Sequence, residues 1–231
     1  IQASPRGFAA ALAPLTPAAA PAWGNSTPQA HADYLAWSGT TRKLPGDFQY
    51  GEVVRWLNER LPPETILCNG AGNFAGWLHR HHRFSRLAPT SGSMGYGVPA
   101  AVMAKRQCPE SPVVVVAGDG DFLMNGQEFA TAVQHDIPVL VVVIDNGMYG
   151  TIRMHQERDY PGRVSATRLR NPDFAAYARA FGGHGETIRA TAEFAPAFER
   201  ALASGKPAIL HCFLDPRALS VGRDMPEGAK A

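Results

Sequence analysis

The chain has 231 residues, of which 45% are hydrophobic, and a formal net charge of +2. This apolar content is ample for a buried core, and the scattered Lys and Arg residues argue against a nucleic acid or a strongly acidic molecule as partner. The apolar runs are shorter than the roughly 18 residues of a membrane span, so no membrane contact is expected. Cys68, Cys108 and Cys212 are isolated thiols without CxxC spacing, which argues against a zinc site or a disulfide framework and favours a cytoplasmic setting.

The first elements in chain order are helical. Phe8–Leu12 predicts one or two helical turns, and the Pro-rich residues that follow predict a linker. Phe48–Leu61 carries an apolar stripe at helical spacing, with Asp47 as its expected N-cap. Thr65–Cys68 is a short apolar run and predicts the first strand.

A Gly-rich turn, Asn69–Asn73, follows this first strand, and a His-rich segment comes next. His79, His81 and His82 are interleaved with arginines and stand too close together for a well-ordered set of metal ligands. We expect a solvated or interface segment there, with a metal site as the less favoured alternative. Val98–Lys105 is then predicted to form a helix packed on the sheet.

The centre of the chain predicts a strand–helix–strand unit. Val113–Gly118 and Val139–Asp145 are β-branched runs typical of buried parallel strands, and Met124–His135 between them has helical spacing. Both strands of such a unit end on the same edge of the sheet, which is where ligands bind in open α/β folds. Asp119 and Asn146, which follow the two strands, should therefore lie close together.

The polar residues at this edge predict a site for a metal and a diphosphate. Gly118 and Gly120 allow close backbone approach, and the following helix would offer N–H groups to phosphate. Asp119 and Asp121 would repel a bare phosphate, and this conflict is resolved if Mg²⁺ lies between them. Three interpretations fit less well. The sequence lacks the third Gly of a dinucleotide fingerprint and the GK[ST] of a P-loop, and Gly-Asp-Gly as a simple turn leaves Asn146 unexplained.

The C-terminal third predicts further α/β elements. The charged and Gly-rich residues 154–170 predict a mobile loop able to order over the site. Asn171–Phe181 predicts a helix with Asn171 as cap and Pro172 at its first position. Phe194–Ser204 predicts the last long helix, and Pro207–Leu214 the last strand. The fold class is therefore α/β, an open and mainly parallel sheet with helices on both faces.

Two motifs together resemble one protein family. Gly118-Asp-Gly120 followed by a strand ending in Asn146, and the upstream segment Thr90–Ala101, look like the signature of thiamine-diphosphate-dependent enzymes. The resemblance is to their diphosphate-binding (PP) domain, in the acetolactate-synthase-like branch, and covers about residues 46 to 215.

The resemblance implies a domain organisation and a partner. Residues 46–231 would form the PP domain, and residues 1–45 the end of a preceding middle domain plus an Ala/Pro-rich linker. A separate short subunit is the alternative to a fragment. The family needs a Glu from a PYR domain of the same or a neighbouring chain, so a homodimer or homotetramer is expected. No matching Glu motif is found here, and this chain alone should be inactive.

The resemblance also implies roles for single residues. Met94 would wedge beneath the cofactor, and the Gly92 carbonyl would accept a hydrogen bond from its pyrimidine amine. Magnesium would be held by Asp119, Asn146 and the Met148 carbonyl. Further contacts with thiamine diphosphate are implied for Asn73, Ser93, Gly118, Gly120, Asp121 and Tyr149.

Three departures from the family pattern bear on the activity. Gly70–Asn73 lacks the Gln and His of acetolactate synthases, which puts true acetolactate synthesis in doubt. Asp145 stands where many relatives have Asn. Arg153 stands where pyruvate decarboxylases have an acid; it would attract a substrate carboxylate or phosphate, or simply face solvent.

The interpretation that follows is the cofactor-binding half of a 2-keto acid carboligase or decarboxylase. Two alternatives stay open. One is a non-catalytic or regulatory homologue that keeps the cofactor-binding fold, and the other is a different α/β phosphate-binding module.

Overall fold

The computed structural model describes residues 2–16, 19, 22–83 and 86–225. The chain divides into two compact units, residues 1–40 and 41–231. The first unit holds α1 (Pro5–Leu12) and α2 (Ser26–Ser38). The helical turns at Phe8–Leu12 are thus present, whereas α2 lies in the predicted linker and was not expected. Residues 1, 17–18 and 20–21 lie outside the described part of the chain.

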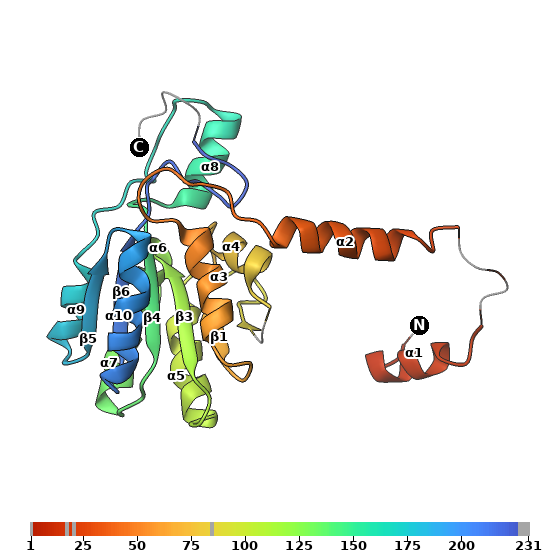
Figure 1. Cartoon of the computed structure of the whole chain (residues 1–231), viewed down its shortest axis with the longest axis horizontal. Helices are drawn as coiled ribbons and strands as arrows, with labels where there is room; N and C mark the ends of the chain where they lie inside the picture. Colours follow the sequence, from red (N-terminus) through yellow and green to blue (C-terminus); the bar gives the residue numbers. More distant parts are fainter. Residues whose placement is uncertain (1, 17–18, 20–21, 84–85, 226–231) are drawn as a thin grey trace. The chain divides into compact units, whose positions relative to one another are not determined.

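The second unit is built on a parallel sheet. Within the described residues six strands follow the order β2-β1-β3-β4-β6-β5, and every neighbouring pair is parallel. The strands are β1 (Ile66–Asn69), β2 (Arg86–Leu87), β3 (Val113–Gly118), β4 (Leu140–Asp145), β5 (His184–Ile188) and β6 (Ala208–Phe213). The predicted α/β class with an open, parallel sheet is confirmed, and Figure 1 shows the strands side by side.

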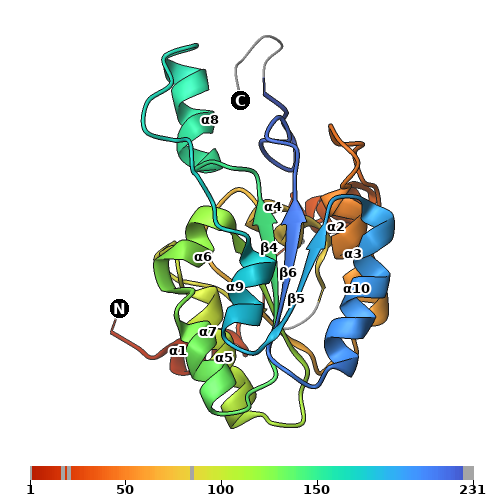
Figure 2. The same ribbon diagram turned by 90° about the vertical axis from the view of Figure 1, so that its left-hand side faces the viewer.

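Helices cover both faces of this sheet (Figure 2). One face is covered by α3 (Tyr50–Arg60), α4 (Ala75–His81) and α10 (Thr191–Ala203). The other is covered by α5 (Gly97–Gln107), α6 (Asp119–Asn125), α7 (Glu128–Gln134) and α9 (Phe174–Ala180). One further helix, α8 (Gly150–Asp159), lies beyond the carboxyl ends of the strands.

The valine-rich strands explain the two layers. Side chains alternate between the faces of a strand. Val114 and Val116 of β3 therefore belong to the core beneath α3 and α10, and Val113 and Val115 to the core beneath α5 and α7. All six residues of β3 and of β4 are buried, so neither face of these strands meets solvent. This two-sided burial is why the sequence shows continuous apolar runs rather than alternation.

Several predicted boundaries are wrong. Helix α3 begins at Tyr50 with Gln49 as its cap residue, and the carbonyl of Asp47 instead accepts hydrogen bonds from Thr191. The single helix predicted over 124–135 is two helices, α6 and α7, separated at Gly126 and Gln127. At Gly126 a Cβ atom would lie 2.5 Å from the Phe122 ring, so the tight packing there requires glycine.

The C-terminal third differs more. The loop predicted over 154–170 begins as helix α8, which continues to Asp159. Strand β5 was not predicted. Helix α9 is capped by Asp173, whose carboxylate accepts a hydrogen bond from the Ala176 N–H at 3.0 Å, and not by Asn171. Asn171 instead reaches the carboxyl ends of the central strands.

The His-rich segment is not solvated as a whole. His79 is exposed, but His81 and His82 are 3% and 8% exposed. Burial and the nearby Arg86 lower the pKa of His82 to about 4, so its ring is neutral near pH 7. Among the described residues no group of three or more His, Cys, Asp or Glu side chains is arranged to hold a metal ion. None of the described helices is both long and apolar enough to cross a membrane.

Candidate functional site

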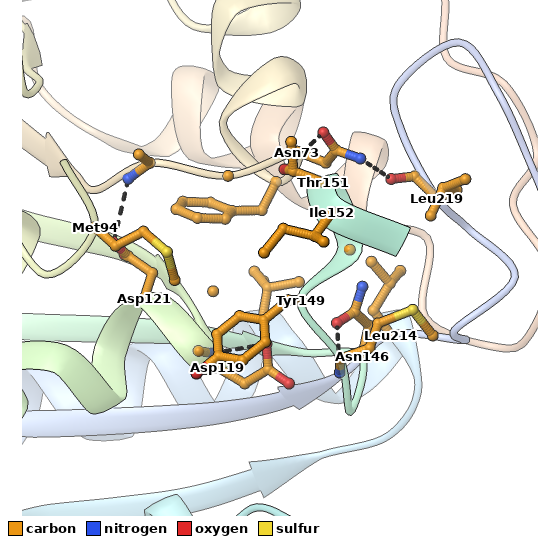
Figure 3. Close-up of a pocket in the computed structure, with 18 of the residues that line it drawn as sticks. Asn73, Met94, Asp119, Asp121, Asn146, Tyr149, Thr151, Ile152, Leu214 and Leu219 are labelled. Carbon is orange, nitrogen blue, oxygen red and sulfur yellow. Dashed lines mark hydrogen bonds between the residues drawn. The ribbon is translucent and has the colours of Figure 1, made fainter. Parts of the chain in front are cut away.

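A pocket lies at the carboxyl ends of the central strands (Figure 3). Its walls come from the turns that follow β1, β3 and β4, from Met94, and from the segment after β6. The predicted site residues that line it are Asn73, Met94, Gly118, Asp119, Gly120, Asp121, Asn146, Met148 and Tyr149. Gly92 and Ser93 are not among the described residues that line it. The topology therefore gathers most of the predicted set at one place, as expected for parallel strands.

Asp119 is the buried acid of this pocket. Its side chain is 3% exposed, and its Oδ1 accepts a hydrogen bond from the Gly120 N–H at 2.9 Å. Its Oδ2 accepts from the Gly147 N–H at 2.9 Å and from the Asn171 amide at 2.7 Å. Burial, and then repulsion by Asp145, raise the pKa of Asp119 to about 7. A cation beside this carboxylate would favour its ionised form.

Asn146 belongs to the turn that packs against Asp119. The hydrogen bond from Gly147 to Asp119 places this turn directly beside the β3–α6 turn. Asn146 Oδ1 accepts from the Met148 N–H at 3.2 Å, which folds the turn back on itself. Gly147 has a φ of 68°, a conformation that glycine adopts without strain. The two predicted metal-binding turns are therefore neighbours, 27 positions apart in sequence.

Gly118 and Gly120 allow two aromatic rings to pack on the pocket floor. A Cβ atom at Gly118 would lie 2.9 Å from the Phe74 ring, and one at Gly120 would lie 2.6 Å from the Tyr149 ring. Both distances are shorter than a carbon–carbon contact. The glycines are thus required by the packing of the pocket as well as by the turn.

Asp121 has a role that the sequence did not suggest. Its side chain is 3% exposed, and its Oδ1 accepts from the N–H groups of Gly95 at 2.7 Å and Ala71 at 3.2 Å. A Cβ atom at Gly70 would lie 1.9 Å from the same oxygen. Burial raises the pKa of Asp121 to about 6. The carboxylate therefore joins the loop after β1 to the turn that carries Met94.

Met94 and Gly92 belong to the segment before Gly95 and are less buried than Asp121. Met94 is half-buried and lines the pocket. Gly92 has a φ of 68°, and a Cβ atom there would meet nothing within 4 Å among the described residues. Its backbone is accordingly accessible. The hydroxyl of Ser93 lies 3.0 Å from that of Ser91.

Asn73 joins three segments around the pocket. Its Oδ1 accepts from the Thr151 hydroxyl at 2.9 Å, and its Nδ2 donates to the Leu219 carbonyl at 2.8 Å. The loop after β1, the first turn of α8 and the C-terminal segment are therefore fastened together at one side chain. Tyr149, the N-cap of α8, and the first turn of this helix line the pocket.

Arg153 is neither solvent-facing nor part of the pocket lining. Its side chain is 3% exposed and pairs with Glu157 one helical turn away, with Nε 2.9 Å from the carboxylate oxygen. Glu157 also accepts from the Gly162 N–H at 3.2 Å. The pair connects α8 to the segment that follows it, and the carboxylate of Glu157 compensates the charge of Arg153.

Known proteins provide an independent comparison. Residues 70–212 match the family described as thiamine pyrophosphate enzyme, C-terminal TPP binding domain. The chain is 34% identical over 178 residues to acetolactate synthase isozyme 2 large subunit of Escherichia coli K12, which covers 74% of this chain and 32% of that protein. It is 33% identical over 156 residues to sulfoacetaldehyde acetyltransferase of Alcaligenes xylosoxydans xylosoxydans, covering 65% of this chain and 26% of that protein.

The fold is shared with solved structures. A thiamine diphosphate-dependent 4-hydroxybenzoylformate decarboxylase of Rhodococcus jostii RHA1 superposes with a TM-score of 0.70 at 23% identity, covering 77% of this chain and 35% of that one. The chain spans between 26% and 35% of the length of these relatives. The matched residues include the β3–α6 and β4–α8 turns of the pocket. On these grounds the chain belongs to the thiamine pyrophosphate-dependent enzymes and carries their C-terminal cofactor-binding domain.

Proposed function

We propose that this chain is the thiamine diphosphate- and Mg²⁺-binding half of a 2-keto acid carboligase or decarboxylase. The observation that carries the proposal is the buried Asp119 carboxylate beside the Asn146 turn. A pKa raised to about 7 means that the ionised form of this buried acid is unfavourable by itself, and a divalent cation would compensate its charge. Carboxylate, amide and carbonyl oxygens are the donors that Mg²⁺ prefers, so the residues present fit this ion.

Each part of the pocket then has a task. Asp119, Asn146 and the Met148 carbonyl would hold Mg²⁺, and the N–H groups of Gly120 and Asp121 would face the diphosphate. Met94 would support the cofactor rings, and the Gly92 carbonyl would accept from the pyrimidine amine. Thiamine diphosphate, when bound, supplies the electron sink for cleavage of the bond next to a carbonyl.

The chain itself contributes an apolar wall to the site. Phe74, Trp77 and Leu214 line the pocket and are buried. An apolar wall excludes water and lowers the local dielectric, which strengthens every electrostatic interaction of a bound diphosphate. The protein would thus position the cofactor and keep water from its reactive part.

The proposal includes a second domain in the active assembly. Leu123 and Met124 of α6 are 44% and 46% exposed, and Met124 lies next to Gly95; Ile152 at the pocket is 52% exposed. Large exposed apolar side chains at these two places support an interface as part of this proposal. The expected partner is a PYR domain of the same or a neighbouring chain, in a cytoplasmic homodimer or homotetramer that acts on a 2-keto acid.

A calorimetric titration tests the proposal. Thiamine diphosphate should bind the chain when Mg²⁺ is present and much more weakly without it, and Asp119→Ala should abolish this metal-dependent binding. Glu110→Ala changes an exposed acid just before β3 and serves as the matched control. Binding of a nucleotide in place of thiamine diphosphate would support a different phosphate-binding module. Metal-dependent binding without turnover in a complete assembly would support a non-catalytic homologue.

A further inference from the structure

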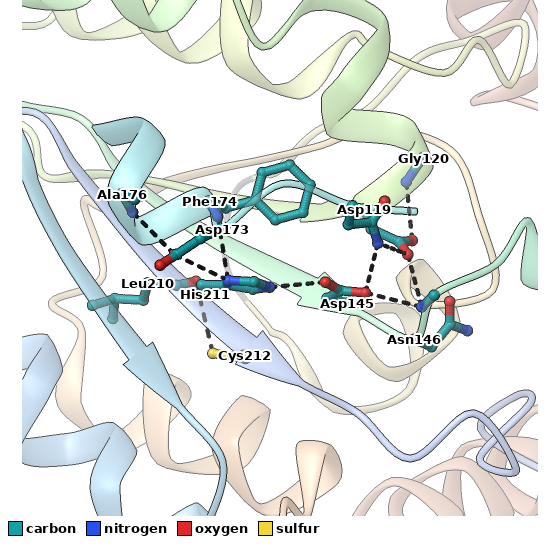
Figure 4. A network of polar contacts seen from close by, with 12 residues as sticks. Asp119, Gly120, Asp145, Asn146, Asp173, Phe174, Ala176, Leu210, His211 and Cys212 are labelled. Atoms are coloured by element: carbon teal, nitrogen blue, oxygen red, sulfur yellow. Dashed lines mark hydrogen bonds and ion pairs between the residues drawn. The ribbon is translucent and has the colours of Figure 1, made fainter. Parts of the chain in front are cut away.

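A buried polar network lies directly behind the proposed metal ligands (Figure 4). Asp145 ends β4 and is 6% exposed, and His211 in the neighbouring strand β6 is 2% exposed. His211 Nε2 and Asp145 Oδ2 are 2.8 Å apart. Burying a charged group is costly unless hydrogen bonds compensate it, so this pair calls for a specific explanation.

The surroundings of His211 define its hydrogen-bonding roles. The Phe174 N–H donates to His211 Nδ1 at 3.3 Å, so Nδ1 is the acceptor and Nε2 carries the hydrogen that Asp145 accepts. The ring lies against Phe174 and Phe213, with centroids 5.0 and 4.3 Å away. The exposed Asp173 approaches Nδ1 only to 3.7 Å. The imidazole is therefore held in one orientation that directs a donor at Asp145.

Asp145 passes this constraint on to Asp119. Its Oδ1 accepts from the Gly147 N–H at 2.9 Å and from the Asn171 amide at 2.7 Å. The same two donors also bind Asp119 Oδ2. The Gly147 N–H and the Asn171 amide NH2 thus each join the two carboxylates, and Gly147 belongs to the turn that carries Asn146. A displacement of Asp145 would therefore disturb the placement of Asp119 and of the turn that carries Asn146.

We propose that His211 and Asp145 form a matched pair of positioning residues that fixes Asp119 and the Asn146 turn for metal binding. This inference rests on the proposed function. His211 supplies the donor for Asp145 Oδ2, and without it this buried carboxylate oxygen would lose its hydrogen bond. A neutral Asn at position 145 would have no such requirement. Groups that orient metal ligands from behind commonly affect metal affinity about 10–100-fold.

A double-mutant cycle on the whole chain separates positioning from general stabilisation. The four proteins are the wild type, His211→Phe, Asp145→Asn and the double variant, and His211→Gln is added because its amide keeps a donor toward Asp145. The first readout is the dissociation constant of Mg²⁺ at saturating thiamine diphosphate. Urea unfolding of each variant is measured alongside, so that a loss of global stability is recognised separately.

We expect His211→Phe to raise the Mg²⁺ dissociation constant tenfold or more in the wild-type background, on the order found for such groups. In the Asp145→Asn background the same change should have less than about a threefold effect, because the carboxylate that needs the His211 donor is no longer present. His211→Gln should recover part of the affinity. An equal loss in both backgrounds, or no loss in either, overturns the proposal.

A second readout needs no ligand. Amide hydrogen exchange at Gly147 reports the N–H that Asp119 and Asp145 share. Exchange should accelerate in His211→Phe and return toward the reference rate when Asp145→Asn is added. Unchanged exchange at Gly147 in His211→Phe would overturn the proposal that His211 and Asp145 position this turn, even if the variant still bound Mg²⁺. If the wild type fails to bind Mg²⁺ with thiamine diphosphate, the proposed function fails, and this exchange measurement still decides on the pair.

Discussion

Asp119 makes the stability of the metal-free chain depend on pH. Its pKa is about 7 in the folded chain against an ordinary value of 3.8. Between these values the folded state binds more protons than the unfolded state, so stability from this group is complete below pH about 4 and is lost as the pH rises through about 7. Asp121 acts in the same direction, with a pKa of about 6. Each unit of difference corresponds to about 1.4 kcal/mol.

We therefore expect Asp119→Asn to flatten the pH profile of stability between about pH 4 and about pH 7. The measurement is urea unfolding of the metal-free wild type and variant at a series of pH values, and only their difference is used, because other acids titrate in both. Adding Mg²⁺ with thiamine diphosphate should offset the loss in the wild type alone. Parallel profiles for the two proteins would contradict the prediction.

Asp121 allows a second test at the level of one residue. Asp121→Ala leaves the buried N–H group of Gly95 and the partly buried one of Ala71 without their acceptor, which costs roughly 1–3 kcal/mol. Asp121→Asn keeps an acceptor oxygen of the same reach and removes only the charge. We expect the Ala variant to be less stable than the Asn variant, with faster amide exchange at Gly95. Equal stability and equal exchange in the two variants would remove Asp121 from this role.

At the scale of elements, the residue that caps α9 differs between the sequence prediction, which named Asn171, and the structure. The Asp173 carboxylate caps the helix, whereas Asn171 bonds to Asp119 and Asp145. Asp173→Ala should therefore reduce the unfolding free energy by about 1 kcal/mol. Asn171→Ala, in contrast, should weaken Mg²⁺-dependent cofactor binding, because it removes a donor shared by two carboxylates. Urea unfolding and calorimetry on both variants check this, and a reversed pattern would restore Asn171 as the cap.

The elements show which features a sequence can predict. Strands β3, β4 and β6 were found because central parallel strands are buried on both faces and read as continuous apolar runs. Strand β5 was missed because it lies at the sheet edge and carries His184 and Glu186, which pair with each other there. Helix α2 was missed because Ser26–Ser38 has no apolar stripe.

The pocket shows the same division. The turns with Asp119 and Asn146 could be predicted because the topology of a strand–helix–strand unit brings both to one sheet edge. The side-chain roles of Asp121, Asn171 and His211 could not, because each depends on a partner more than 20 positions away in sequence. Such contacts follow from tertiary packing, and no local pattern encodes them. Arg153 was misplaced for a different reason: its partner Glu157 is only four positions away, but the burial of this pair depends on how α8 packs.

At the scale of the whole molecule, the pocket lies at one edge of the sheet, where the strands end. The turns of the sheet edge form its floor, and exposed apolar residues stand beside it. The aligned part of this chain covers 32% of the Escherichia coli protein. An α/β domain that presents a cofactor floor and an apolar rim is suited to closure by a second domain.

We expect the purified chain alone to show no turnover of 2-keto acids, and turnover to appear when a protein that supplies the PYR domain is added. The physical reason is that no Glu motif matching the family's catalytic acid was found in this sequence. The contact surface is tested with Leu123→Glu, which places a charge on the exposed apolar residue of α6. Leu202→Glu on α10 changes a residue of similar exposure, 41% against 44%, and is the matched control.

Light scattering of mixtures should show weaker association for Leu123→Glu, by about 1 kcal/mol or more as expected for loss of an apolar interface residue, and no change for Leu202→Glu. Activity of the mixture should fall in parallel with association, because a displaced PYR domain cannot bring its Glu to the cofactor. Turnover by the chain alone, or equal effects of the two substitutions, would show that the catalytic assembly does not close over the β3–α6 edge.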